Sequence, residues 1–230
     1  MVDYMGAIKL PFGNMKGLAI GSVIGAIPFV NMFVSGYGLL AAKKAIDGKA
    51  GLPSWKSNIA NIIVKTIMAI IIGMIYILPG LVLVLVGVAA AVGPIIAAVM
   101  SGSSESLGAA IGTAIVAGGA FFLLGMLLWI IGGLLATMGM MNWVKKGNFM
   151  SAFALGTALK KVITGTFWVS VIVMIAYAIA AMFIAGIIAA ILAFIPVLGW
   201  VLSLLVQGLV VYILSVTTYT IYARVYAETP

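Results

Sequence analysis

The stretch that decides the fold is residues 162–223, which read VITGTFWVSVIVMIAYAIAAMFIAGIIAAILAFIPVLGWVLSLLVQGLVVYILSVTTYTIYA. These positions contain no charged residue. A helix needs about 20 residues to cross roughly 30 Å of hydrocarbon, so the run is long enough to cross twice. Its natural hairpin is Ile195-Pro196-Val197-Leu198-Gly199-Trp200, where proline lacks a donor, glycine permits a turn and tryptophan favours an interface. The predicted crossings are 163–194 and 201–222.

The composition of the whole chain agrees with this stretch. Of 230 residues, 65% are hydrophobic and 7% are charged, and the mean hydropathy is +1.35. A soluble domain carries about 25% charged residues, and a disordered chain has low hydrophobicity. The sequence therefore predicts an all-α, polytopic helical membrane protein that forms a single integral membrane domain over residues 1–230.

Charges divide the middle of the chain into two long apolar runs, 66–104 and 106–144. Each run would be about 59 Å long as one helix, too long for a straight crossing and short for two crossings with a loop. Pro79-Gly80 and Gly93-Pro94 can kink or end a helix. We therefore predict a crossing over 59–88 with a broken extension to 100, a polar loop at Ser101–Ser106, and a crossing over 107–137.

The first apolar segment, 17–42, has lysines at both ends and a proline in its middle. Lys16 precedes it, Lys43 and Lys44 follow it, and Pro28 and Asn31 interrupt it. Two interpretations remain open: a re-entrant pair of short helices, or a single crossing with the N-terminus outside. Non-helical backbone at membrane depth requires shielding by protein or water. The total is about five membrane segments.

A short internal similarity bears on that choice. Ile27-Pro28-Phe29-Val30-Asn31 resembles Ile195-Pro196-Val197-Leu198-Gly199, and each lies between apolar segments rich in glycine or alanine. If the two are related, the first is also a helical hairpin, shorter than the second. The alternative is a chance match in an apolar chain of low complexity.

The basic residues suggest an orientation. They gather in two clusters and after the last crossing: Lys43, Lys44, Lys145, Lys146, Lys160, Lys161 and Arg224. Two crossings separate each basic site from the next, so all can face the cytoplasm under the positive-inside rule. This interpretation predicts the cell membrane, cytoplasmic basic loops and a cytoplasmic C-terminus. It also accounts for the net charge of +8 without nucleic acid as a partner.

Small residues recur at helical spacing in three places. They are Gly13, Gly17, Gly21 and Gly25; Gly118, Gly125, Gly132 and Gly139; and Ala181, Ala185, Ala189 and Ala193. Small residues let two helix backbones approach closely in a membrane. We interpret these ladders as helix packing within the chain, or alternatively as the seam of a homo-oligomer.

The residue types present argue against catalysis. The chain has no cysteine and no histidine, and its four acidic residues lie in separate polar segments. The sequence therefore predicts no enzyme activity, no catalytic or metal-binding residues and no cofactor. Asn31 and Gln207 are the candidate polar sites within the membrane, although a hydrogen bond between helices explains either residue as well.

One stretch carries a family resemblance. Gly36-Tyr37-Gly38-Leu39-Leu40 is followed by Lys43-Lys44, Asp47-Gly48 and Leu52-Pro53-Ser54-Trp55. With the Ile27-Pro28 bend and the early Leu10-Pro11-Phe12, this resembles the membrane family catalogued as domain of unknown function 4013, over residues 8–80. The resemblance implies a multi-pass membrane protein, no established activity and no site residues.

Two functions fit these observations. The first is a non-enzymatic scaffold or accessory subunit of a membrane assembly, whose partners are the lipid bilayer and either itself or another membrane protein. The alternative is a passive channel or permease for a small solute or lipid, with the broken segments at Pro28 and Pro79 lining a cavity.

Overall fold

Every regular element in the part of the chain that the structure describes is helical, which confirms the all-α class. The computed structural model describes residues 2–102 and 104–229, including all side chains in these ranges except those at 104 and 105. The chain divides into two compact units, Met1–Ile70 with Thr137–Pro230 and Ile71–Ala136. The single membrane domain over residues 1–230 stays a prediction.

Four helical stretches are long and apolar enough to cross a membrane. They are Lys56–Ser101, Ser106–Lys146, Gly165–Leu192 and Leu198–Glu228. Met15–Ala26 is a shorter apolar helix. By the length and composition of its helices, the protein is a multi-span membrane protein, as the composition predicts.

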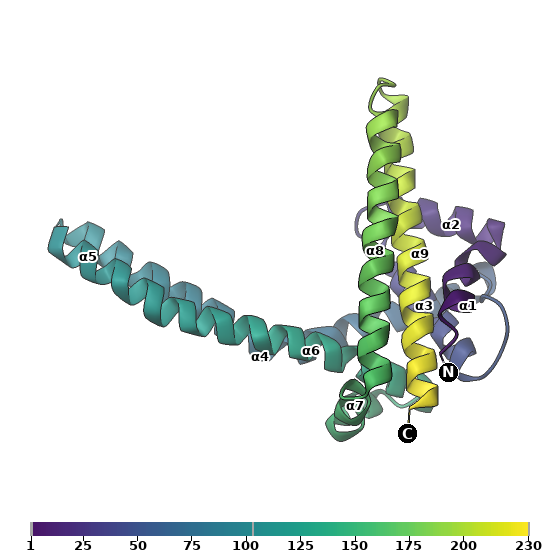
Figure 1. Ribbon diagram of the computed structural model, residues 1–230, viewed down its shortest axis with the longest axis horizontal. Helices are drawn as coiled ribbons and strands as arrows, with labels where there is room; N and C mark the ends of the chain where they lie inside the picture. Colours follow the sequence, from purple (N-terminus) through teal and green to yellow (C-terminus); the bar gives the residue numbers. More distant parts are fainter. Residues whose placement is uncertain (1, 103, 230) are drawn as a thin grey trace. The chain divides into compact units, whose positions relative to one another are not determined.

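Helix α9 (Leu198–Glu228) is the centre of the first unit. Helix α8 (Gly165–Leu192) lies beside it, and α2 (Met15–Ala26) and α3 (Met32–Ile46) pack on it as well (Figure 1). The remaining short elements of this unit are α1 (Tyr4–Lys9), the 3-10 helices at Leu10–Gly13, Lys56–Asn58 and Phe149–Phe153, and α7 (Leu155–Val162). The start of the described chain lies near the end of α9, where Arg224 forms an ion pair with Asp3.

The predicted first segment is a helical hairpin. Helix α2 contacts α9 through Gly21 and then Gly25, which face Tyr212 and then Gly208, so it runs toward the start of α9. Helix α3 returns toward the end of α9, because the Val34 carbonyl accepts from Ser215 Oγ at 3.3 Å and Gly38 faces Tyr219 further along.

Neither helix of this hairpin is long enough to cross alone. At 1.5 Å per residue, the 12 residues of α2 and the 15 of α3 extend about 18 and 23 Å, less than the roughly 30 Å of hydrocarbon. The single crossing considered for 17–42 does not match this geometry, because the helix stops at the proline and the chain turns back.

The two Ile-Pro turns have the same backbone geometry. In the first, Val30 N donates to Pro28 O at 2.8 Å and Asn31 N donates to Ile27 O at 3.0 Å. In the second, Leu198 N donates to Pro196 O at 2.6 Å and Gly199 N to Ile195 O at 2.9 Å. The residue after each proline has a positive φ, 64° at Phe29 and 58° at Val197. The sequence similarity therefore corresponds to one shared three-residue turn.

The predicted break in the second segment is wrong. Helix α4 runs without interruption over Ile59–Ser101, with Pro79 and Pro94 inside it. Proline removes one backbone hydrogen bond, but an apolar chain favours helix over open backbone because every other polar group stays paired. A bend at Gly102 follows, with φ at +70°. The predicted Ser101–Ser106 loop is accordingly shorter, and its Ser103 lies outside the described residues.

Beyond that bend the chain is again helical. Helix α5 (Ser104–Thr113) continues through a π-helical turn at Ala114–Gly118 into α6 (Gly119–Lys146). The crossing predicted for 107–137 therefore lies inside a longer apolar helical stretch.

Candidate functional site

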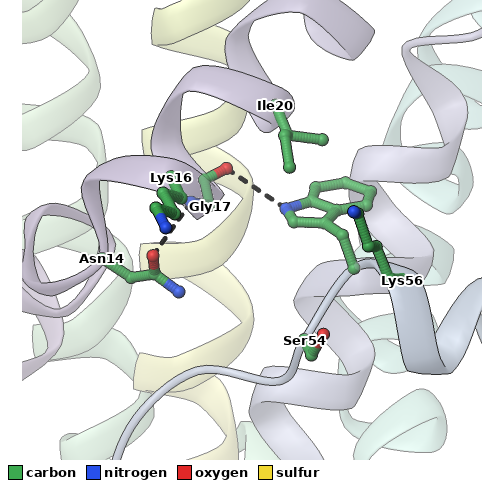
Figure 2. A pocket seen from close by; sticks show the side chains of 7 residues that line it. Asn14, Lys16, Gly17, Ile20, Ser54 and Lys56 are labelled. Atoms are coloured by element: carbon green, nitrogen blue, oxygen red, sulfur yellow. Dashed lines mark hydrogen bonds between the residues drawn. The ribbon is translucent and has the colours of Figure 1, made fainter.

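The segment between α3 and α4 is held by its tryptophan. Trp55 Nε1 donates to the carbonyl of Gly17 on α2 at 3.2 Å, and this bond is the dashed line that ends on the Gly17 oxygen in Figure 2. The Tyr37 hydroxyl on α3 donates to the carbonyl of Pro53 at 2.9 Å. These two bonds tie the Leu52-Pro53-Ser54-Trp55 segment to both helices of the first hairpin.

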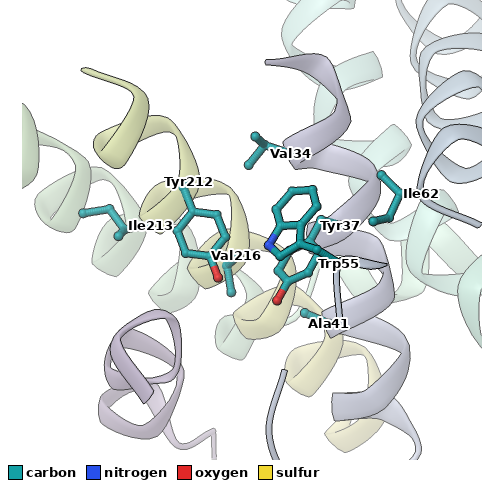
Figure 3. Close-up of a cluster of buried hydrophobic side chains, with 8 residues drawn as sticks. All are labelled: Val34, Tyr37, Ala41, Trp55, Ile62, Tyr212, Ile213 and Val216. Atoms are coloured by element: carbon teal, nitrogen blue, oxygen red, sulfur yellow. The ribbon is translucent and has the colours of Figure 1, made fainter. Parts of the chain in front are cut away.

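An aromatic cluster lies behind that segment (Figure 3). The rings of Tyr37 and Trp55 stack with centroids 4.1 Å apart and planes 5° apart. Tyr212 of α9 lies tilted against both, at 5.8 and 6.4 Å. Trp55 is 8% exposed, and the two tyrosines are fully buried. These residues form the core of the hairpin base, because stacked aromatic pairs stabilise beyond the area that they bury.

Two glycines beside Tyr37 allow α3 to approach its neighbours. A Cβ at Gly36 would clash with Thr66 and the Ile62 carbonyl on α4, and one at Gly38 would clash with Tyr219. The Gly-Tyr-Gly stretch is therefore a packing element. Sequence reasoning gave it no structural role, since two small residues around one aromatic carry no periodic signal.

The predicted glycine ladder of α2 has different environments along its length. Gly21 lies under the Tyr212 ring, and a Cβ at Gly25 would be 2.5 Å from the Gly208 carbonyl oxygen. Gly17 meets only the Asn14 side chain of its own helix start, and Gly13 faces open space. Gly208 was missed from the sequence, because no other small residue three or four positions away marks it in α9.

In the second unit, the predicted glycine stripe lies on α6 and the π-helical turn before it, and it faces α4. A Cβ at Gly118 would be 2.7 Å from Ala91 Cβ, and one at Gly125 would be 2.8 Å from the Gly80 carbonyl. Gly132 faces the carbonyl of Tyr76. All three contacts lie within the chain. The seam between copies, which was the other interpretation, stays a prediction.

The two candidate polar residues lie on different elements. Asn31 is exposed and lies in the Ile-Pro turn between α2 and α3, directly before α3. Its side chain makes no hydrogen bond that caps that helix. Gln207 is exposed on α9. It borders a shallow hollow of about 330 Å³ with six residues of α8 and α9, namely Met182, Ala185, Gly186, Ala189, Val210 and Val211. The structure does not join Asn31 and Gln207 into one site.

Several of the predicted basic anchors have partners inside the protein. Lys43 Nζ forms an ion pair with Asp47 Oδ1 at 3.2 Å, and Lys44 Nζ donates to the Leu52 carbonyl at 3.2 Å. Lys145 Nζ lies 5.5 Å from the centroid of the Tyr226 ring. Lys146 and Lys160 are exposed.

Lys161 is buried at the end of α9, with 8% of its surface exposed. Its ammonium donates to the carbonyls of Tyr226, at 3.2 Å, and Thr229, and lies 4.9 Å from the Tyr226 ring centroid. Burial, and then the charge of Lys145, lowers the pKa of Lys161. A cation at a helix C-terminus satisfies carbonyls that have no helical partner. Lys161 therefore caps α9 from within the protein.

Two basic hollows flank the Trp55 segment. The first, called the Trp55 hollow, has about 340 Å³ and is lined by Asn14, Lys16, Gly17, Ile20, Ser54, Trp55 and Lys56. The second, called the Lys43 hollow, has about 330 Å³ and is lined by Leu40, Lys43, Lys44, Asp47, Lys49, Leu52, Pro53, Ser54 and Asn58. Ser54 borders both. Together the two hollows contain five lysines and one aspartate, a basic surface whose chemistry suits anions.

Acidic side chains do not gather in the same way. Among the residues that the structure describes, no three acidic side chains come together as a metal site would require. The polar groups available in the Trp55 hollow for a ligand are the two ammonium groups, the Ser54 hydroxyl and the amide nitrogen of Asn14, whose Oδ1 accepts from Gly17 N.

Four long apolar helices and a basic, aromatic hairpin base define the class as a multi-span membrane protein. The chain belongs to the family described as protein of unknown function (DUF4013), whose model matches residues 20–194. The match confirms the resemblance seen from the sequence and extends it well beyond residue 80, while Pro11-Phe12 lies outside it. No curated protein and no solved structure gave a significant match.

Proposed function

We propose that the protein is a non-enzymatic scaffold or accessory subunit of a membrane assembly. The observation that supports this function is the open surface of α8. Only 11% of its most apolar stretch is buried by the rest of the described chain. Ala185 and Ala189 are half-buried, whereas Gly186 between them faces open space. A glycine between small residues leaves a flat surface on a long apolar helix, against which a second helix can pack closely.

The use of polar groups in the long helices supports the same proposal. The Thr66 hydroxyl donates to the Ile62 carbonyl at 2.9 Å, and Ser170 Oγ lies 3.0 Å from the Tyr4 hydroxyl. Lys65 Nζ lies 4.7 Å from the centroid of the Trp143 ring. Each of these three groups contacts a partner within the fold. Ion-coupled transport instead places ionisable groups around a cavity at mid-depth.

The proposal includes a topology. The hairpin α2–α3 is re-entrant and enters from the cytoplasmic side, on which the basic clusters and the C-terminus also lie. With the four long helices this makes five membrane segments in the cell membrane. The supporting features are the short lengths of α2 and α3 and the lysines at the base of the hairpin.

Crosslinking in native membranes tests the scaffold function. The chain has no cysteine, so a single introduced thiol reports on one position. Gly186→Cys places a thiol in open space, and Gly125→Cys, packed against α4, is the matched control. We expect an intermolecular product, with itself or another membrane protein, at position 186 and none at position 125. No product at 186, and no membrane protein that copurifies, would overturn the proposal.

Flux into liposomes tests the passive permease, which remains the alternative. A solute-selective leak that is lost in Gln207→Ala or Asn31→Ala would replace the scaffold with a permease. Flux equal to that of empty vesicles supports the scaffold.

A further inference from the structure

We propose that the Trp55 hollow binds the phosphate of an anionic phospholipid headgroup. Lys16 comes from the start of α2 and Lys56 from the start of the helical stretch after Trp55. Figure 2 shows them on opposite sides of the hollow, with Ile20 above and Ser54 below. A phosphodiester carries one negative charge and two free oxygens, which two ammonium groups and one hydroxyl can bind together.

The lysines of the Trp55 hollow are available for a ligand. Lys16 and Lys56 are exposed, and within the described residues neither forms an ion pair or side-chain hydrogen bond. In the Lys43 hollow, by contrast, Lys43 is paired with Asp47 and Lys44 donates to the Leu52 carbonyl. The Trp55 hollow is therefore the better anion site of the two.

The wall of the hollow is fixed before any ligand arrives. The Trp55 indole is held by its stack on Tyr37 and its bond to Gly17. A preorganised wall lowers the entropic cost of binding.

An apolar strip beside the hollow identifies the ligand as a lipid. Ile20 and Val23 are at i and i+3 on one face of α2, and Ile27 follows just after its end; they are 38%, 51% and 45% exposed. The strip extends about 10 Å from the hollow toward the tip of the hairpin. An acyl chain can lie along it while the phosphate remains between the lysines. A neutral phosphocholine would bring its own cation against the same lysines, so the site favours anionic lipids.

Native mass spectrometry of the full-length protein in detergent micelles tests the proposal. The protein is titrated with dioleoylphosphatidylglycerol, with dioleoylphosphatidylcholine, and with inorganic phosphate as competitor. We expect Lys16→Gln/Lys56→Gln to weaken phosphatidylglycerol binding about thirtyfold, on the order of fivefold for each lysine. Lys146→Gln/Lys160→Gln removes the same charge from two exposed lysines elsewhere and should change binding less than about twofold.

Further variants and a competition experiment distinguish lipid binding from loss of the fold and from binding of free phosphate. Lys16→Arg/Lys56→Arg should retain binding, and an unchanged unfolding midpoint in each glutamine variant excludes loss of the fold. Equal losses in both glutamine doubles, or no loss in the Lys16/Lys56 double, would overturn the proposal. Displacement of lipid by millimolar inorganic phosphate would also overturn it, since the hollow would then take free phosphate and not a lipid.

Discussion

The two Ile-Pro hairpins of the first unit share a turn and differ in length. In each, a proline is followed by a residue with positive φ, Phe29 in one and Val197 in the other. Both residues are more than 80% exposed at the tip. The first hairpin has helices of 12 and 15 residues, whereas the second has helices of 28 and 31. One turn thus serves a hairpin long enough to cross a bilayer and one that is not.

The small residues before the turn are also shared, but their use differs. Gly21 and Gly25 lie six and two residues before Ile27, and Ala189 and Ala193 lie at the same distances before Ile195. In the short hairpin these positions pack against α9, whereas Ala193 is exposed. The short hairpin therefore depends on close packing and on its aromatic base, while the long one depends on its own length.

The largest expected difference concerns the aromatic base. Trp55→Ala should lower the free energy of unfolding by about 3–5 kcal/mol, because it removes a buried ring from the stack with Tyr37. Trp200→Ala, at the tip of the long hairpin and 70% exposed, should cost less than about 1 kcal/mol. Unfolding in mixed detergent micelles measures both. Equal costs would remove the distinction between the two hairpins.

A smaller difference in stability is expected between Gly25 and Ala193, the equivalent small residues before the two turns. Gly25→Leu should cost about 1–3 kcal/mol, because its side chain has to displace the α9 backbone at Gly208. The equivalent Ala193→Leu should change stability by less than about 0.5 kcal/mol. The same unfolding assay applies. A tolerated leucine at position 25 would show that α2 does not need close contact with α9.

Glycine substitutions at the two Ile-Pro turns should have similar effects on stability. Phe29→Gly and Val197→Gly should each raise the free energy of unfolding by about 0.5–1 kcal/mol, since the strain of a left-handed residue exceeds the entropic cost of glycine. The gain should be larger at Val197, which is β-branched. Opposite signs at the two positions would show that the turns are alike in form but not in energy.

The smallest effect is a pH dependence where the chain start meets the end of α9. A hydrogen bond from Gly6, and then Arg224, lowers the pKa of Asp3 below its ordinary 3.8. The stabilisation is therefore present above pH 3.8 and is lost as the pH falls through the lowered pKa. Asp3→Asn should remove this acid dependence. The difference in unfolding midpoint between wild type and variant, measured at pH 6 and pH 2.5, tests it.

Hydropathy and turn chemistry predicted much of this fold. The uncharged run around Pro196 predicted the long hairpin, and its similarity to the Pro28 region indicated the short one. At Pro79 and Pro94, by contrast, the prolines predicted a break in the helix, whereas the helix continues through both. Proline alone does not distinguish a turn from a kinked helix, because the outcome depends on whether neighbouring helices shield the freed backbone groups.

The base of the short hairpin was less accessible from the sequence. Trp55 fits an interfacial position by its place in the chain, yet it is a core residue, because Tyr37 and Tyr212 meet it from distant segments. Lys161 likewise has the sequence context of a surface anchor and instead caps α9. Neither contact has a local pattern, since each joins residues far apart in the chain.

The short hairpin has a consequence for the bilayer itself. If it enters from one side and stops before the other, as proposed, the first unit occupies more area in one leaflet than in the opposite leaflet. Lipids around such a wedge pack with less strain where the membrane is curved and the wider side of the protein lies on the convex surface. We therefore expect protein inserted with its cytoplasmic side outward to be enriched in small, strongly curved vesicles over large flat ones, which sorting between vesicle sizes would measure.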